Sequence, residues 1–275
     1  MAKTIAVTGA NSGIGKAVAE QLARSGERVL LVCRDEQRGR EALQELQSRT
    51  GSGALELFLG DLSSLQSVRA VAAQIGAKHP KLDALVSCAA VFVTGDRKTT
   101  KDGHEMMFGT NFLGTFALTV LLGPALQAAA PSRVVTLAAP PGGSPLDFDN
   151  LQGEKKFSAF SAFAASKTCD VLFAFKLARA WKDKGVTSVA VHPGLVRSGI
   201  MRNAALPIRL ITALVSSSPE KTAASIARLA TLAESPALTG ELITKGKPMK
   251  VPPYIRDEAA QDRLWSIGAQ ITGIQ

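Results

Sequence analysis

The 275-residue sequence has few cysteines and no long apolar run, and both shortages limit what the protein can be. Its three cysteines, Cys33, Cys88 and Cys169, are odd in number and widely spaced, which predicts reduced thiols and a cytoplasmic protein. They also lack the spacing of a metal site, so we expect no metal. No apolar run approaches the ~20 residues of a membrane span, and a strand-like run begins close to the N-terminus. We therefore expect neither a membrane-spanning helix nor a signal peptide.

Aromatic residues are also scarce, at 5% of the chain, and this affects how the formal net charge of +9 is interpreted. The lysines and arginines are scattered singly or in short clusters such as Arg97-Lys98 and Lys155-Lys156. A nucleic-acid-binding surface usually gathers basic residues in one stripe with aromatic residues between them. We therefore expect a solvated basic surface and no nucleic-acid partner.

What the chain does contain is a regular alternation of strand-like and helical segments. The predicted strands are Thr4–Val7, Arg28–Cys33, Ala54–Gly60, Leu82–Ser87, Arg133–Ala138, Thr187–Val191 and Leu238–Thr244. The longer predicted helices include a continuous one over Glu105–Ala129 and another over Ser158–Lys184. This alternation predicts one α/β domain over residues 1–275, doubly wound, with a parallel sheet covered by helices on both faces.

The stretch from Thr8 to Gly15 joins the first strand to the first helix. Glycine at Gly9 and Gly13 lets backbone N–H groups approach a pyrophosphate, and Gly15 lets helix and strand pack closely. A second apolar run, Arg28 to Cys33, follows the helix as a βαβ unit requires. We therefore predict a dinucleotide-binding turn; the alternative is a glycine-rich loop that only reverses the chain.

Motifs along nearly the whole chain match one known family. They are Thr8 to Gly15, Val32-Cys33-Arg34-Asp35, Gly60-Asp61-Leu62-Ser63-Ser64, Thr100 to Glu105, Gly109-Thr110-Asn111-Phe112-Leu113-Gly114, Ser132-Arg133-Val134-Val135, Ser166-Lys167, His192-Pro193-Gly194, Arg263-Leu264-Trp265 and Thr272-Gly273. On these segments the chain resembles the short-chain dehydrogenase/reductase family, specifically its retinol-dehydrogenase-like branch. The resemblance implies a single Rossmann-type domain with about seven parallel strands, usually assembled as a homodimer or homotetramer.

The resemblance also implies which residues meet the cofactor. It places Asp61 and Leu62 at the adenine, Asn111 in the active-site helix and Lys167 on the nicotinamide ribose. A carboxylate such as Asp61 at a strand's carboxyl end lies where folds of this kind bind ligands, and it is also a plain helix-capping residue. The full set of expected cofactor-binding residues is Gly9, Asn11, Ser12, Gly13, Ile14, Gly15, Arg34, Asp61, Leu62, Ala89, Asn111, Lys167, Pro193, Gly194, Val196 and Ser198.

The end of the second strand bears on the choice between NAD and NADP. A carboxylate there would bind ribose hydroxyls, whereas an arginine would bind a 2′-phosphate. Cys33 occupies the position at which NAD users of the family would have their acid, and Arg34 follows it. We therefore predict NADPH or NADP rather than NAD. The alternative is that Asp35 takes the ribose hydroxyls.

The catalytic positions depart from the family pattern. The family places a tyrosine, its general acid, four residues before the lysine, and a serine at the end of the fifth strand. This chain has Phe163 and Ala139 there, so neither position has a hydroxyl. At the end of the fourth strand, Ser87-Cys88-Ala89-Ala90 replaces the common Asn-Asn-Ala-Gly. The only tyrosine, Tyr254, matches the ordinary pattern of the branch and is not a relocated acid.

Other residues near these positions bear on the substrate. Cys88 could act as an acid or nucleophile or simply be buried. Phe157, Phe160 and Phe163 recur at helical spacing and could line an apolar pocket, although core packing is the more ordinary role for the first two. Residues 199–218 correspond to the family's substrate-covering segment, and their apolar character favours a hydrophobic small-molecule substrate over contact with a membrane surface.

Three functions are compatible with this pattern. We favour an atypical NADPH-dependent reductase acting on a C=N bond, a C=C bond or an activated carbonyl of a hydrophobic small molecule. The alternatives are a non-redox biosynthetic catalyst, such as a cyclase or isomerase, and an inactive cofactor-binding protein that acts through a partner.

Overall fold

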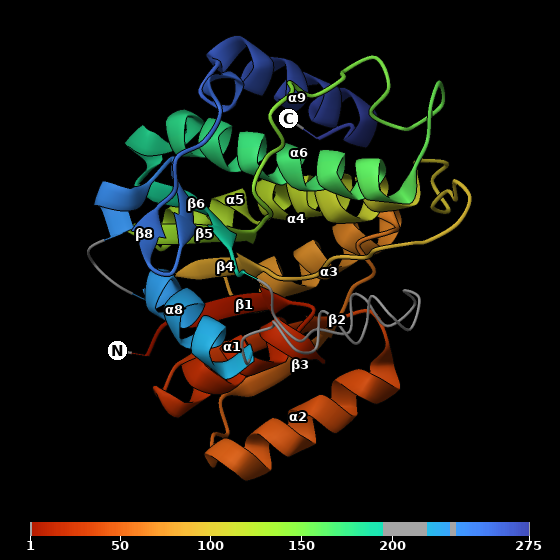
Figure 1. Cartoon of the computed structure of the whole chain (residues 1–275). Helices are drawn as coiled ribbons and strands as arrows, with labels where there is room; N and C mark the ends of the chain where they lie inside the picture. Colours follow the sequence, from red (N-terminus) through yellow and green to blue (C-terminus); the bar gives the residue numbers. More distant parts are fainter. Residues whose placement is uncertain (1, 195–218, 232–234, 275) are drawn as a thin grey trace.

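The computed structural model describes residues 2–194, 219–231 and 235–274, and these form one α/β domain (Figure 1). The strands are β1 (Thr4–Thr8), β2 (Arg28–Cys33), β3 (Leu55–Leu59), β4 (Ala84–Ser87), β5 (Ser132–Leu137), β6 (Val186–His192), β7 (Leu242–Thr244) and β8 (Lys247–Pro248). They form an eight-stranded sheet in the order β3-β2-β1-β4-β5-β6-β7-β8. The first seven pair in parallel and the short β8 is antiparallel to β7.

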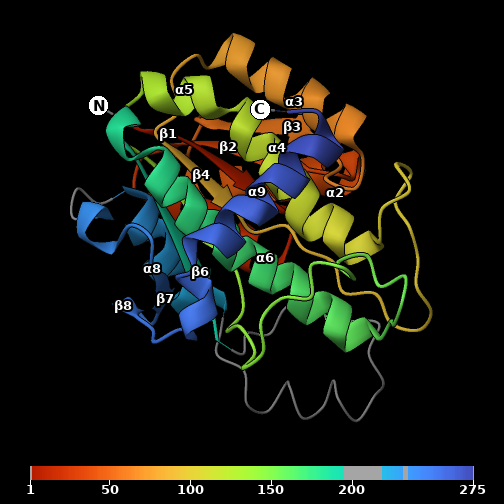
Figure 2. The ribbon, with the colours of Figure 1, turned by 90° about the horizontal axis from the view of Figure 1, so that it is seen from above.

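Helices cover both faces of this sheet. They are α1 (Gly13–Arg24), α2 (Glu36–Thr50), α3 (Leu65–Lys78), α4 (Gly114–Leu121), α5 (Gly123–Ala128), α6 (Ala159–Ala180), α8 (Pro219–Thr231) and α9 (Glu258–Thr272), with a π-helix at Phe108–Leu113 and short 3₁₀ turns at Lys182–Lys184, Ser235–Leu238 and Pro253–Ile255. One apolar core lies under α1, α2 and α8, and the other lies under α3 to α6. In the view from above, α9 crosses the outer side of α4 and α6 (Figure 2).

Sequence pattern and burial explain why these segments adopt their structures. β2 and β4 are largely apolar runs that are buried almost throughout, as expected for central parallel strands with helices on both faces, and β5 is buried throughout although it includes Ser132, Arg133 and Thr136. In α1, Val18, Ala19, Leu22 and Ala23 form a buried stripe at helical spacing. No helix in the described ranges is both long enough and apolar enough to cross a membrane.

The predicted helix over Glu105–Ala129 is wrong in one respect, because the structure divides it. It begins as the π-helix, continues as α4 and restarts as α5 after Leu122. Pro124, in the first turn of α5, explains the restart because its ring cannot fit within a continuous helix. The strand β8 was not predicted, since two residues are too short to show a pattern.

The strand order determines where a ligand can bind. β2 and β3 lie on one side of β1, and β4 to β8 lie on the other. The order therefore reverses between β1 and β4, and doubly wound sheets bind their ligands at the carboxyl ends of the strands beside such a reversal.

Candidate cofactor and active site

The glycine turn lies directly at this reversal. Gly9 and Gly13 have φ values of 67° and 54°, in the left-handed region that favours glycine. A Cβ atom on Gly15 would lie 2.5 Å from the carbonyl oxygen of Gly9, and one on Gly9 would lie 3.0 Å from Cα of Ala89. The turn therefore folds tightly over the start of α1 and against the chain that leaves β4.

The start of α1 fits a phosphate group. Ser12 is the N-cap with extended backbone, but its side chain makes no capping hydrogen bond. The N–H groups of the first helical turn thus lack a capping side chain, and the helix dipole makes this end partly positive. A helix N-terminus entered through a glycine turn is suited to the pyrophosphate of a dinucleotide.

Thr8 joins the ends of β1 and β4 beneath this turn. Its buried hydroxyl oxygen accepts hydrogen bonds from the backbone N–H groups of Cys88 and Ala89, both at 3.0 Å. Sequence reasoning did not assign Thr8 this role. The available signal was a hydroxyl at the last position of an otherwise apolar strand.

At the end of β2, Arg34 and Asp35 are the two possible partners of the adenine ribose, and they differ in their existing contacts. Asp35 is the N-cap of α2, and its carboxylate accepts from the backbone N–H of Arg38 at 2.9 Å. Arg34 is exposed. Cys33 is buried, and burial raises the pKa of its thiol to about 12 although the backbone at Ala10 and Asn11 hydrogen-bonds it. The side chain before Arg34 is therefore neutral.

Asp61 and Leu62 follow β3. One carboxylate oxygen of Asp61 accepts from the backbone N–H of Ser63 at 3.0 Å and from its hydroxyl at 2.8 Å. The cap of α3 is Ser64 rather than Asp61. Leu62 is buried, and a Cβ atom on Gly114 would lie 2.2 Å from its carbonyl oxygen, so α4 begins in direct contact with this segment.

Asn111 lies in the π-helix, with only 1% of its surface exposed. Its amide oxygen accepts from the backbone N–H of Val91 at 2.8 Å, and its amide nitrogen donates to the carbonyl of Val91 at 3.1 Å and to the hydroxyl of Ser166 at 3.0 Å. The Ser166 hydroxyl in turn donates to the carbonyl of Phe163 at 2.8 Å. Asn111 thus fixes the segment after β4 to the part of α6 that holds Phe163 and Ser166.

Lys167 lies on α6 and is 6% exposed. Its Nζ donates to the carbonyl of Leu137, the last residue of β5, at 3.0 Å and to a carboxylate oxygen of Asp170 at 2.8 Å. Asp170 is 1% exposed, and burial raises its pKa to about 6 despite the nearby ammonium. Sequence reasoning missed Asp170. The signal was an acidic residue three positions after Lys167, on the same face of the helix.

Phe163 presents an apolar ring where the family's acid would be. It packs edge-on against the ring of Phe92, with centroids 5.3 Å apart, and the ring of Phe160 lies 5.2 Å from Phe92. We call Phe92, Phe160 and Phe163 the aromatic cluster. Core packing was the ordinary expectation for Phe160, and it is wrong: this side chain is 61% exposed because it lies in the first, outward-facing turn of α6.

Phe157 and Ala139, two other residues expected near the site, are both half-buried. Phe157 is half-buried and packs against the backbone of Gly153 in the loop before α6, not in either core. Ala139 is half-buried, just past the end of β5. The two positions at which the family resemblance expects hydroxyls, 163 and 139, therefore carry only carbon and hydrogen in their side chains.

The remaining predicted residues contribute less chemistry. Burial raises the pKa of the Cys88 thiol to about 12, more than the nearby Lys167 lowers it, so this thiol is protonated at neutral pH and is a poor nucleophile. Pro193 and Gly194 follow β6, and Gly194 has a φ of 77°. Val196, Ser198 and the segment 199–218 lie outside the described residues.

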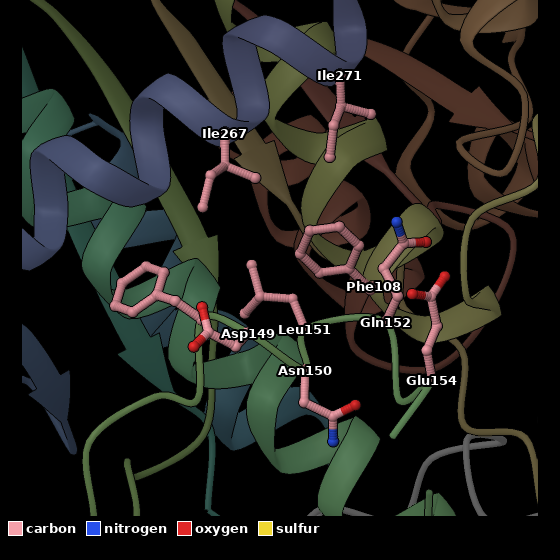
Figure 3. Close-up of a pocket in the computed structure, with 9 residues that line it drawn as sticks. Phe108, Asp149, Asn150, Leu151, Gln152, Glu154, Ile267 and Ile271 are labelled. Atoms are coloured by element: carbon pink, nitrogen blue, oxygen red, sulfur yellow. The ribbon is translucent and has the colours of Figure 1, made fainter. Parts of the chain in front are cut away.

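A separate cavity of about 250 Å³ lies on the α9 side of the domain (Figure 3). Its residues are Phe108, Phe148, Asp149, Asn150, Leu151, Gln152, Glu154, Ile267 and Ile271. None of them is among the residues assigned to cofactor or catalysis. Across the ranges that the structure describes, no three histidine, cysteine or carboxylate side chains are grouped as metal ligands.

Comparison with known proteins agrees with this geometry. The family model for short chain dehydrogenases matches residues 3–207. Retinol dehydrogenase 12 of Mus musculus is 37% identical over 277 residues, covering 99% of this chain and 87% of that protein.

Solved structures extend the comparison. An uncharacterized protein from Mycobacterium paratuberculosis has a TM-score of 0.77 and 27% identity, covering 99% of this chain and 94% of its own. A structure from Beutenbergia cavernae with bound NADP has a TM-score of 0.71 and 27% identity, covering 88% of this chain and 94% of its own. The chain belongs to the short-chain dehydrogenase/reductase family of oxidoreductases, in its retinol-dehydrogenase-like branch.

Proposed function

We propose that this protein binds NADP(H) and reduces a hydrophobic small molecule at a C=N bond, a C=C bond or an activated carbonyl. One observation carries the proposal. The glycine turn and the hydrogen bonds of Asn111 and Lys167 support a bound cofactor, while Phe163 and Ala139 carry no hydroxyl where the family resemblance expects one.

Contacts at the end of β2 support NADP over NAD. Asp35, the only carboxylate in the segment from Cys33 to Asp35, already accepts a hydrogen bond as the N-cap of α2. Arg34 is exposed and can form a charge-assisted hydrogen bond to a 2′-phosphate. Similar structures hold either cofactor, NADP in the one from Beutenbergia cavernae and NADH in one from Brucella melitensis, so this proposal depends on Arg34 and Asp35.

The residues of this chain would divide the work as follows. When bound, the cofactor supplies a hydride donor. The glycine turn and the start of α1 would hold its pyrophosphate, and Lys167, fixed by the Leu137 carbonyl, would orient the nicotinamide ribose.

The aromatic cluster would hold the apolar part of the substrate and exclude water from the site. No side chain at position 163 or 139 can protonate a carbonyl oxygen, and the loss of a positioned acid costs about 10²–10⁴ in rate. A substrate that already carries positive charge, such as an iminium, is neutral after it takes hydride and needs no proton from the site. An enone that takes hydride at its β-carbon leaves an enolate, which water can protonate, so it also avoids this cost. The relatives are named for retinol, which agrees with a hydrophobic substrate class.

The same missing hydroxyls also support two other functions. A non-redox catalyst, such as a cyclase or isomerase, could use the apolar site to shape its substrate. An inactive cofactor-binding protein could act through a partner. The intact hydrogen bonds of Asn111 and Lys167 favour a working site over a decayed one. We further propose a cytoplasmic location and a homodimer or homotetramer.

Calorimetric titration of the purified protein with NADPH, NADP⁺ and NADH tests the cofactor. We expect the two phosphorylated forms to bind at least about tenfold more tightly than NADH, because a charge-assisted hydrogen bond is lost with the 2′-phosphate. Absence of binding at millimolar cofactor would contradict the proposed reductase function.

Single-turnover oxidation of bound NADPH then tests the reaction. Cyclic iminium ions and enones should oxidise it, whereas simple ketones of the same carbon skeleton should not. If NADPH binds but none of these substrates oxidises it, the non-redox or inactive alternatives take precedence.

A further inference from the structure

A buried ion pair lies at the end of β5, next to the crevice. Lys167 and Asp170 are three residues apart on α6, and Nζ lies 2.8 Å from the carboxylate and 3.0 Å from the carbonyl of Leu137. The electrostatic influence of Lys167 also reaches Cys88, at the end of β4. The ammonium therefore lies at the carboxyl end of β5, the second strand after the reversal.

Only one of the two carboxylate oxygens of Asp170 is used in the ion pair with Lys167. Its second oxygen is buried and has no hydrogen-bond partner among the described residues. A buried oxygen without a partner is unfavourable, and a polar group kept at such a cost suggests a functional role. Its visible partner is Lys167, the residue expected at the nicotinamide ribose.

The two redox forms of the cofactor differ by one positive charge on the nicotinamide ring. A lone ammonium beside the ribose would repel the cationic ring of NADP⁺ and leave neutral NADPH unaffected. A carboxylate in contact with that ammonium makes the pair neutral and removes the discrimination.

We propose that Asp170 neutralises Lys167 and thereby sets the relative affinity for oxidised and reduced cofactor, keeping NADP⁺ binding close to that of NADPH. Asp170 is then a positioning residue that acts through Lys167 rather than by contact with substrate. This inference rests on the proposed NADP(H)-binding function.

The test compares dissociation constants of NADP⁺ and NADPH for the wild type and Asp170→Asn. Asparagine keeps the shape and an oxygen for Lys167 but removes the charge. The ratio of the NADP⁺ constant to the NADPH constant should rise about tenfold, because one positive charge becomes unneutralised at short range. The matched control is Asp183→Asn, an exposed carboxylate in the turn after α6, which should leave the ratio unchanged.

A second measurement uses the wild-type protein alone. Lowering the pH from 7.5 to 5 protonates Asp170 and should raise the same ratio, while the 2′-phosphate, common to both cofactor forms, cancels. The neighbouring titratable groups are Lys167 and the thiols of Cys88 and Cys169. Burial raises the pKa of both thiols, so they stay neutral over this pH range. His192, at the end of β6, is controlled by repeating the titration with His192→Gln.

Each outcome is decisive. A ratio that is the same in the wild type and Asp170→Asn, with both forms bound, overturns the inference and leaves the proposed function standing. Failure of the wild type to bind either form contradicts the proposed function itself. If Asp170→Asn does not fold, a pH-independent ratio in the wild type overturns the inference.

Discussion

The ring of Phe163 lies edge-on to the ring of Phe92, with centroids 5.3 Å apart and planes inclined by 80°. Phe163 stands four residues before Lys167, where the family resemblance expects a tyrosine, so its ring presents a hydrophobic surface in place of a hydroxyl. Aromatic pairs in this geometry contribute about 0.5–1.5 kcal/mol beyond the area that they bury. The position at which the family resemblance expects the acid is thus held in an aromatic contact.

Restoring both hydroxyls should restore ordinary carbonyl reduction. In the variant Phe163→Tyr with Ala139→Ser, tyrosine would supply the general acid and serine would bind the same oxygen, contributing roughly 10²–10⁴ and 10²–10³ in rate. Steady-state reduction of simple ketones with NADPH measures this gain. Phe160→Tyr, which adds a hydroxyl at an exposed neighbouring position, is the control and should gain nothing.

If the double variant binds NADPH yet reduces no ketone, the site has been rebuilt for other chemistry. The proposed reductase would then be disfavoured relative to the non-redox catalyst.

Phe160 should matter to substrate binding and little to folding. Because its side chain is 61% exposed, Phe160→Ala should change the free energy of unfolding by at most about 0.5 kcal/mol. The loss of one face of the aromatic cluster should raise KM for an apolar substrate several-fold, with kcat nearly unchanged. Chemical unfolding and steady-state kinetics check the two parts, and an unchanged KM would exclude Phe160 from the substrate site.

Arg34 should determine the preference for phosphorylated cofactor. Arg34→Ala should weaken NADPH binding by about tenfold to a hundredfold through loss of a charge-assisted hydrogen bond, and should leave NADH binding unchanged. Arg40→Ala is the matched control, because Arg40 forms an exposed ion pair with Glu36 on the same helix. Equal effects of the two substitutions on NADPH would show only a general loss of positive charge.

Gly15 should tolerate no side chain. The Cβ atom of Gly15→Ala would lie 2.5 Å from the Gly9 carbonyl oxygen and 2.8 Å from its carbon, so the turn must shift. We expect a loss of about 1–3 kcal/mol in unfolding free energy together with loss of cofactor binding. Gly76→Ala on α3 is the control: no atom lies within 4 Å of its Cβ position, and alanine should stabilise the helix by about 0.5–1 kcal/mol. Normal cofactor binding by Gly15→Ala would exclude the turn from the site.

The burial of Asp170 should appear in the pH dependence of stability. Its pKa rises from 3.8 in the unfolded chain to about 6 in the folded protein, so the folded state holds the proton more tightly. Its contribution to stability is therefore full below about pH 4 and is lost as the pH rises through 6, by an amount on the order of 3 kcal/mol. Urea unfolding at pH 4 and pH 7.5 measures this. The free energy of unfolding of Asp170→Asn, relative to that of the wild type, should be higher at pH 7.5 than at pH 4.

Lys167→Met should lower the free energy of unfolding at neutral pH. It would leave the Asp170 carboxylate buried without its counter-ion, which costs about 3–5 kcal/mol. The loss should be smaller at pH 4, where Asp170 is protonated. A pH-independent difference between wild type and Asp170→Asn would contradict the raised pKa.

Much of the fold and part of the site follow from local sequence. The apolar runs that form β1 and β2 are bounded by glycine or charged residues, and strands with helices on both faces of a parallel sheet are expected to be such runs. The π-helix at Phe108–Leu113 and the restart of the helix at α5 were not predicted from the sequence, because residue types indicate only weakly which backbone hydrogen-bond register a helix adopts.

The sequence by itself determined the glycine turn, the missing hydroxyls at Phe163 and Ala139, and the membership of the family, because each depends on which residues stand at fixed separations along the chain. Only the tertiary structure decided that Thr8 supports the chain after β4, that Asp35 caps α2, and that Asp170 forms a buried ion pair with Lys167. These contacts depend on burial and on which groups meet, and both are set when distant strands and helices pack together.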